Sequence, residues 1–103
     1  MQPVKIKIGA KGIIVEPPLV KIPKKAVDEI IEWTISTPGW KFTEDGVVIH
    51  WNFNQFKNRK GSKNQKFNWT SRNTNTGRYE YTIKVTNGTT VASRDPGIKN
   101  GGR

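Results

Sequence analysis

The sequence contains no cysteine, a single histidine (His50) and a single methionine (Met1). Without cysteine, the chain forms no disulfide, thiolate metal site or iron–sulfur cluster and has no thiol nucleophile. A catalytic zinc site usually takes three protein ligands, and a blue-copper site takes two histidines and a cysteine. One histidine supplies neither set, so we predict no metal and no cofactor.

Motifs of the common hydrolytic sites are missing as well. No Gly-x-Ser-x-Gly turn is present to expose a nucleophilic serine, and a Ser–His–Asp relay would have to use His50. The acids Asp28, Glu29 and Glu32 lie close together, but strand alternation or a solvated helix face accounts for them without a catalytic pair. We predict that the protein is not an enzyme and that His50 lies on the polar face of a strand.

Long apolar runs are absent, and no stretch approaches the roughly 20 residues that a membrane-spanning helix requires. Residues 1–8 alternate charged and apolar side chains and lack the continuous apolar centre of a secretory signal. The sequence therefore predicts no membrane span. If Met1 is the native start, it also predicts a cytoplasmic location.

Acidic residues are scarce. Eight Asp and Glu residues stand against eighteen Lys and Arg residues in a chain of 103, which leaves a formal charge of +10. Such an excess attracts polyanions, whether nucleic acid, anionic polysaccharide or an acidic lipid surface. A generally basic surface without a dedicated anion site explains the same composition, so both interpretations stay open.

Apolar residues make up only a third of the chain, but alternation and turn signals organise them. Residues 77–86 alternate apolar and polar side chains at period two, and Asn87-Gly88 then favours a two-residue hairpin turn. Residues 24–37 fit a short helix or a strand, and their β-branched residues favour the strand. Glu44-Asp45-Gly46 predicts a second hairpin turn rather than a calcium loop.

About seven or eight short strands, with at most one helical turn, follow from this pattern. Turn signals at intervals of roughly 8–12 residues are typical of an all-β, antiparallel β-sandwich. We predict one domain over residues 1–103 with a flexible tail over about 96–103. The predicted core comprises Ile6, Ile8, Ile31, Trp33, Ile35, Ile49, Trp51, Tyr81, Ile83 and Val85.

One segment carries the functional prediction, because no acidic residue occurs between Gly46 and Tyr79. Basic, amide and aromatic residues interleave there, a combination typical of proteins that grip single-stranded nucleic acid. We predict a basic loop over about 53–72 that contacts nucleic acid or another polyanion. Its predicted cations are Lys57, Arg59, Lys60, Lys63, Lys66 and Arg72, and its predicted stacking residues are Phe56 and Trp69.

Three alternatives stay open for the same residues. Phe53, Phe67 and Trp69 are explained equally well as core residues beside a charged loop. Aromatic platforms beside amides also bind sugars, so Trp40, Trp51 and Trp69 favour a carbohydrate-binding sandwich as one alternative. The third alternative is a structural or protein–protein interaction module that pairs or self-associates through a sheet edge.

The second half of the chain resembles a known kind of domain. The stretch Gly77-Arg-Tyr-Glu-Tyr-Thr-Ile-Lys-Val-Thr, followed by Asp95-Pro-Gly-Ile98, is similar to the late strands of cupredoxin-like or immunoglobulin-like bacterial sandwich domains. The resemblance covers about half of the chain and implies the β-sandwich architecture. Blue-copper members of the cupredoxin-like group need a cysteine and paired histidines that this chain lacks, so no functional residue is carried over.

Overall fold

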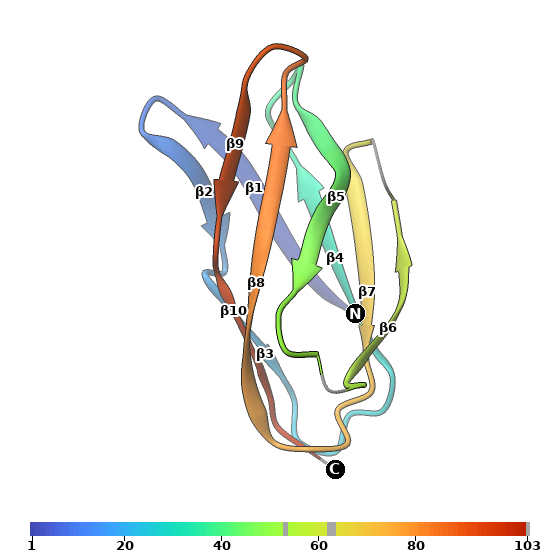
Figure 1. The fold of residues 1–103 in the computed structure, drawn as a ribbon. Coiled ribbons are helices and arrows are strands. Elements are labelled where there is room, and N and C mark those ends of the chain that lie inside the picture. The colour runs from blue at the N-terminus through green and yellow to red at the C-terminus, as the bar shows by residue number, and fades with distance from the viewer. Residues whose placement is uncertain (53, 62–63, 103) are drawn as a thin grey trace.

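The structure is a computed structural model that describes residues 1–52, 54–61 and 64–102. These residues form ten strands and no helix, arranged as two sheets whose inner faces share one core (Figure 1). The first sheet has the order β2-β1-β4-β7-β6 and the second β3-β10-β8-β5, with β9 also paired to β8. The strands are β1 (Gln2–Gly9), β2 (Gly12–Glu16), β3 (Leu19–Ile22), β4 (Glu29–Ile35), β5 (Lys41–Ile49), β6 (Phe56–Lys60), β7 (Lys66–Ser71), β8 (Gly77–Thr86), β9 (Val91–Arg94) and β10 (Gly97–Asn100).

Both sheets are mixed, which corrects the prediction of a purely antiparallel arrangement of seven or eight strands. β1 pairs with β4 and β3 pairs with β10 in parallel, while the other pairs are antiparallel. The cause lies at Pro17-Pro18, which ends the first hairpin and takes the chain from the edge of one sheet to the edge of the other. The edge of β1 that does not pair with β2 is therefore free to pair with β4, which re-enters the first sheet after β3.

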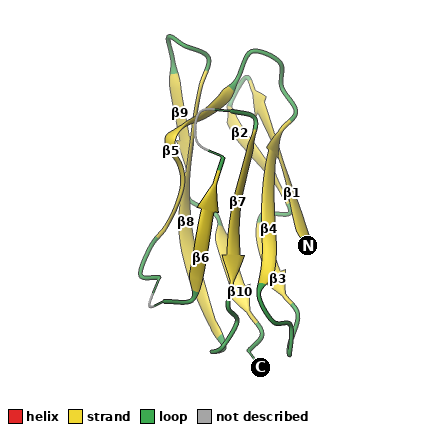
Figure 2. Ribbon diagram, turned by 90° about the vertical axis from the view of Figure 1, so that its right-hand side faces the viewer, coloured by secondary structure: helices red, strands yellow, loops and turns green. Residues whose placement is uncertain are grey.

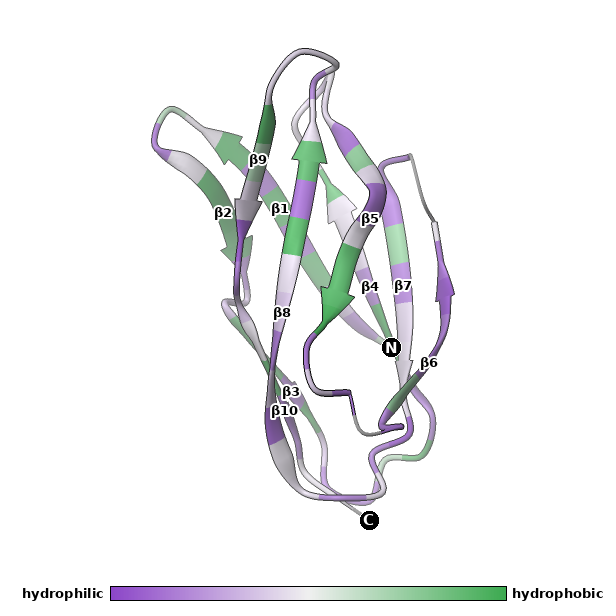
Figure 3. Cartoon of the chain, viewed as in Figure 1, coloured by the Kyte–Doolittle hydropathy of each residue, from purple (hydrophilic) through white to green (hydrophobic). Residues whose placement is uncertain are grey.

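The core confirms most of the predicted inward positions. Trp33 and Tyr81, one from each sheet, are fully buried, and their rings meet edge to face with centroids 5.2 Å apart. The alternation that places them there is visible as bands of opposite hydropathy along β1 and β8 (Figure 3). Predicted core residues that are buried are Ile6, Ile31, Trp33, Ile35, Ile49, Tyr81, Ile83 and Val85; Ile8 is half-buried at the margin.

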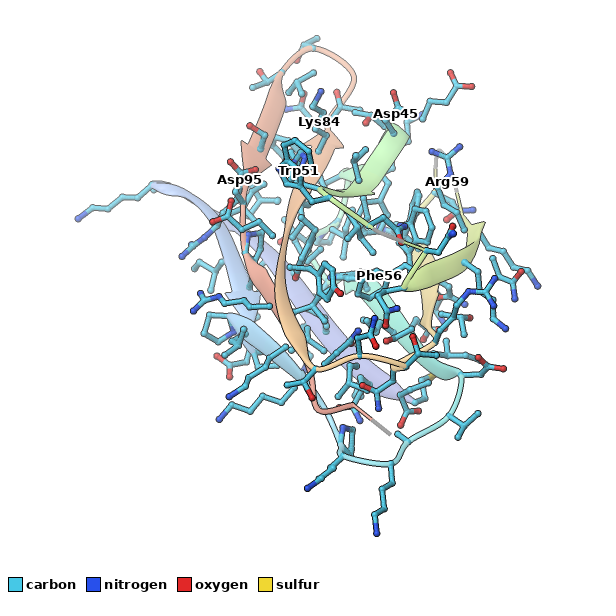
Figure 4. All side chains as sticks on the ribbon, turned by 60° about the horizontal axis from the view of Figure 1, so that its bottom comes forward. Asp45, Trp51, Phe56, Arg59, Lys84 and Asp95 are labelled. Carbon is cyan, nitrogen blue, oxygen red and sulfur yellow. The ribbon has the colours of Figure 1, made fainter. Side chains whose placement is uncertain are left out.

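Trp51 is the one predicted core residue on the outside, with 80% of its surface exposed (Figure 4). β5 ends at Ile49, so the alternation that would bring Trp51 inward stops two residues too early. The backbone of Trp51 has a φ of 50°, which belongs to a turn rather than to an extended strand. The prediction for this residue was therefore wrong.

Of the two predicted hairpin turns, the one after β8 is confirmed and the one at residues 44–46 is wrong. Asn87-Gly88 does lie in the β8–β9 hairpin, but Thr86 pairs with Val91, so the loop has four residues rather than two. Glu44-Asp45-Gly46 makes no hairpin, because β5 runs through it as a bulge while paired to β8. Gly46 is needed at the bulge, since a Cβ there would lie 2.6 Å from the Cβ of Phe42.

Two segments predicted to be irregular are strands. The predicted basic loop 53–72 contains β6 and β7, which lie beside β4 in the first sheet (Figure 2). The predicted flexible tail 96–103 contains β10, which is held between β3 and β8 with Ile98 fully buried. Within the described part of the chain, no helix is long and apolar enough to cross a membrane.

Candidate functional site

The outer face of the first sheet gathers cations from strands that are distant in sequence. Because side chains alternate along a strand, the residues between buried positions point outward. We call the outward lysines of β1, β6 and β7 the basic face. It consists of Lys5, Lys7, Lys57, Lys60 and Lys66, of which Lys57 is half-buried and the others are exposed.

The pairing register fixes where these lysines stand. Lys5 lies opposite Thr34, and Thr34 lies opposite Lys66, so three strands form one row across the sheet. Neighbouring strands are about 4.8 Å apart, which puts the backbones of Lys5 and Lys66 roughly 10 Å from each other. In the next row Lys60 and Glu32 flank Asn68 on its two sides.

Acidic side chains reduce the net positive charge of the basic face. Glu16 and Glu32 point outward on the same face, and Lys57 Nζ lies 3.1 Å from Asp28 Oδ1. A partly exposed ion pair of this kind contributes only about 0–1 kcal/mol, so an incoming anion can displace it at small cost. The five lysines therefore still outnumber the three nearby acids, Glu16, Glu32 and Asp28.

Arg59 faces a different way from its neighbours because β6 contains a bulge. Lys57 pairs with Thr70 and Lys60 with Asn68, so Asn58 and Arg59 together stand opposite one residue. Asn58 has a φ of 58°, and Arg59 Nη1 lies 3.4 Å from Asp45 Oδ1 of β5 (Figure 4). Arg59 therefore bridges towards the second sheet instead of joining the basic face.

Arg72, another predicted cation, is not counted in the basic face because it lies beyond the end of β7. Arg72 follows β7 and is exposed, and its backbone N–H donates to the carbonyl of Gln55 over 2.7 Å. Lys63 lies outside the described residues, as does Phe53. Of the predicted polyanion-binding residues, the structure brings Lys57, Lys60 and Lys66 together.

The predicted stacking residues are mostly turned inward, which corrects the prediction that they offer ring faces to bases. Phe56 is 5% exposed and packs edge to face on Tyr79, with ring centroids 5.1 Å apart (Figure 4). Burial also raises the pKa of Tyr79 above its usual value. Trp69 is half-buried, and its indole N–H donates to the carbonyl of Val47 over 2.9 Å. Both rings belong to the packing between β5, β7 and β8.

A small hollow on the basic face includes two residues that sequence reasoning missed. It has a volume of about 180 Å³ and lies between Lys60 and Lys66. Glu32 and Asn68 line it as well, and Asn68 Oδ1 is buried without a hydrogen-bond partner among the described residues. The alternation of Phe67 and Trp69 could have placed Asn68 outward with Lys66. A donor group of a bound molecule would satisfy this oxygen.

His50 takes part in a surface hydrogen-bond chain rather than a ligand set. Its Nε2 lies 2.6 Å from Thr82 Oγ1, and Thr82 Oγ1 donates to Asp95 Oδ1 over 2.6 Å. A hydroxyl has one proton, so His50 Nε2 must donate to Thr82. Across the described ranges, no three His, Asp or Glu side chains stand close enough to hold a metal ion.

A second concave surface is formed by residues from the β4–β5, β6–β7 and β8–β9 regions of the chain. We call it the loop cleft. Asn64 and Gln65, just before β7, are held against their neighbours, because Phe42 N donates to Asn64 O over 2.8 Å and Ile35 N to Gln65 O over 2.9 Å. The cleft has a volume of about 480 Å³ and is lined by Gly39, Trp40, Lys41, Asn64, Gln65, Asn87 and Gly88.

No protein-family model matches this chain, and no curated protein matches its sequence. The function of the protein therefore has to follow from the chemistry of the basic face and the loop cleft.

Proposed function

We propose that the chain is a non-enzymatic β-sandwich domain that binds a linear polyanion, such as single-stranded nucleic acid or a sulfated polysaccharide, on its basic face. The observation that carries this proposal is the group of five outward lysines on one sheet, with a hollow between Lys60 and Lys66 at the β6–β7 side of the group. Two sheets around one core, with the 77–86 stretch as the long inner strand β8, support the sandwich architecture that the resemblance implies.

The positions of the aromatic rings determine the kind of binding. Phe56 is buried, and Trp69 is half-buried with its indole N–H bonded to the carbonyl of Val47, so the lysines rather than stacked rings carry the proposed binding. Binding would then come from ammonium groups that neutralise the backbone of the polymer, with little preference for base sequence. The unpaired Asn68 Oδ1 would accept a hydrogen bond from a hydroxyl or amine of the polymer.

Titration at several salt concentrations tests this proposal. Each phosphate contact to a single strand lowers the log–log slope of affinity against salt by about 0.7, so three to five contacts predict a slope of about −2 to −3.5. Oligo-dT and heparin serve as the two probes, and similar slopes for both would agree with binding by charge. No salt-dependent binding of either probe would contradict the proposal.

A matched pair of variants separates the basic face from total charge. The variant Lys60→Gln/Lys66→Gln removes two cations from the hollow and should reduce the steepness of the slope by about 1.4. The control Lys11→Gln/Lys84→Gln removes two exposed cations elsewhere and should keep the wild-type slope. Equal losses in both variants would show attraction to the whole molecule.

Light scattering without polyanion detects self-association through a sheet edge, the competing explanation.

The loop cleft supports a second candidate function, the binding of a neutral carbohydrate. Trp40 offers a half-buried aromatic surface beside the amides of Asn64, Gln65 and Asn87. Gln65 Nε2 donates to the backbone carbonyl of Trp40 over 3.3 Å, which fixes one amide next to the ring. Aromatic surface with a few placed amides suits a sugar ring, which has an apolar face and a rim of hydroxyls.

Tryptophan fluorescence in about 1 M salt tests the carbohydrate candidate, because charge interactions are screened to roughly 3 Å there. A shift on adding neutral oligosaccharides that disappears in Trp40→Ala and persists in Trp51→Ala would support it. Trp51 is the matched control because it is exposed outside the cleft. No shift in the wild-type protein would contradict it.

A further inference from the structure

Three cations stand in one row on the outer face of the second sheet. Lys21 of β3 lies opposite Lys99 of β10, and Lys99 lies opposite Arg78 of β8. All three residues are exposed; Lys21 and Lys99 lie between buried neighbours, and Arg78 lies between Gly77 and the half-buried Tyr79. Lys21 lies more than fifty residues before the other two cations, and Arg78 lies 21 residues before Lys99, so the strand pairing brings the three together.

Like charges at directly opposite positions repel, and each such pair destabilises a sheet by a few tenths of a kcal/mol. None of the three ion pairs between described residues involves a member of this row. Acids on the same face are Glu80, which lies one row further along and opposite Gly97, and Asp95, which accepts from Thr82 Oγ1 in the row beyond it. The row therefore carries an excess of positive charge that a bound anion would relieve.

A hollow lies beside the row, and the backbone around it is fixed. It has a volume of about 210 Å³ and is lined by Lys21, Ile22, Lys99 and Gly101. Gly101 N donates to Ile22 O over 3.0 Å, which holds the end of β3 against the chain that follows β10. A Cβ at Gly101 would lie 2.8 Å from Ile22 O, so glycine permits this close approach.

Arg78 contributes the directional donors. Its guanidinium lies above Gly97, where an added Cβ would be 3.4 Å from Nε and 3.5 Å from Nη2. The absence of a side chain at Gly97 thus leaves room for the guanidinium of Arg78, two residues before Lys99 on β10. Two ammonium groups and one guanidinium are the usual partners of a tetrahedral oxyanion.

We propose that the row Lys21–Lys99–Arg78 is a binding site for a phosphate or sulfate group, separate from the basic face on the other sheet. Lys21 and Lys99 line the hollow, and Arg78 adds a third positive charge to the row, with its guanidinium over Gly97. The bound anion would neutralise the three positive charges that the strand register places side by side. It exists whether or not the basic face binds a polymer, because the two share no residue.

Thermal unfolding and calorimetric titration with inorganic phosphate and with sulfate test this site, with chloride at equal ionic strength as reference. In dilute chloride Lys99→Gln should unfold at a higher temperature than the wild type, because two like-charge contacts disappear. Its affinity for phosphate or sulfate should be about fivefold weaker, as expected for one exposed charge contact. A variant that is more stable yet binds less anion is a result that a purely structural lysine would not produce.

The control is Lys84→Gln, an exposed lysine of β8 that lies opposite Ser93 rather than another cation. It removes the same charge and should keep both the wild-type anion affinity and the wild-type response to general salt effects. Equal anion responses in the wild type, Lys99→Gln and Lys84→Gln would overturn the site. Lys60→Gln/Lys66→Gln should keep the phosphate or sulfate response, so failure of the proposed function and failure of this inference are distinguishable.

Discussion

Replacing Tyr81 by Phe removes one oxygen from the centre of the core and leaves the ring in place. The Trp33 indole N–H donates to Tyr81 Oη over 3.0 Å, and both side chains are 0% exposed. In Tyr81→Phe this donor stays buried without an acceptor, which costs about 1–3 kcal/mol. We expect the free energy of unfolding in urea to fall by about 2 kcal/mol with an unchanged m value, because the folded state still buries the same surface.

The same substitution should also remove a dependence on alkaline pH. Burial raises the pKa of Tyr81 from 10.0 to about 12, against the smaller lowering effects of the Trp33 hydrogen bond and of Arg94. Because the folded state holds the phenol proton more tightly, its stabilisation is complete below pH 10 and is lost as the pH rises to about 12. Two pKa units correspond to about 2.7 kcal/mol. Urea midpoints measured from pH 8 upward should therefore decline less steeply for Tyr81→Phe, and identical midpoints and slopes for both proteins would refute the reasoning.

Three other substitutions test the backbone and the surface charge. Gly61→Ala should destabilise the protein by more than about 1 kcal/mol in urea, because φ is 106° and a Cβ would collide with the carbonyl of Lys66; a neutral effect would contradict this geometry. Asn73→Ala should cost about 2–4 kcal/mol, since its buried side chain satisfies backbone groups on two neighbouring segments; a loss below 1 kcal/mol would count against it. Asp45→Asn releases Arg59 from an exposed pair, so stability should change by less than about 1 kcal/mol while heparin affinity rises; a fall in affinity would be inconsistent.

The inner strands were predictable because one physical rule governs them. Ile31 and Trp33 alternate with polar residues in β4, as Tyr81 and Ile83 do in β8, and period two puts each set on one side. Burial of the apolar set then decides which side faces the core. The rule failed at Trp51, where the strand had already ended and local turn geometry took over.

The edge strand β6 could not be predicted in the same way, because only its first residue, Phe56, is apolar. Its backbone pairs with β7. Hydrogen bonds between residues that are distant in sequence also stabilise this region, and no local sequence pattern reveals them. The side chain of Gln55 is buried, and its Oε1 accepts from the backbone N–H groups of Thr74 and Asn75. A segment whose sequence is polar is thus ordered by tertiary hydrogen bonds, which explains why composition alone indicated a loop.

The cation row shows why charge clusters are harder to predict than cores. Val20 lies opposite Ile98 in the parallel pair of β3 and β10, and both are buried. Burying such side chains is worth about 1.5–3 kcal/mol each, whereas opposing cations cost a few tenths. The apolar residues therefore set the register, and Lys21, Lys99 and Arg78 must take the positions that remain. A slip of one residue would turn the apolar set outward, so the repulsion is too small to move the strands and is relieved instead by an anion.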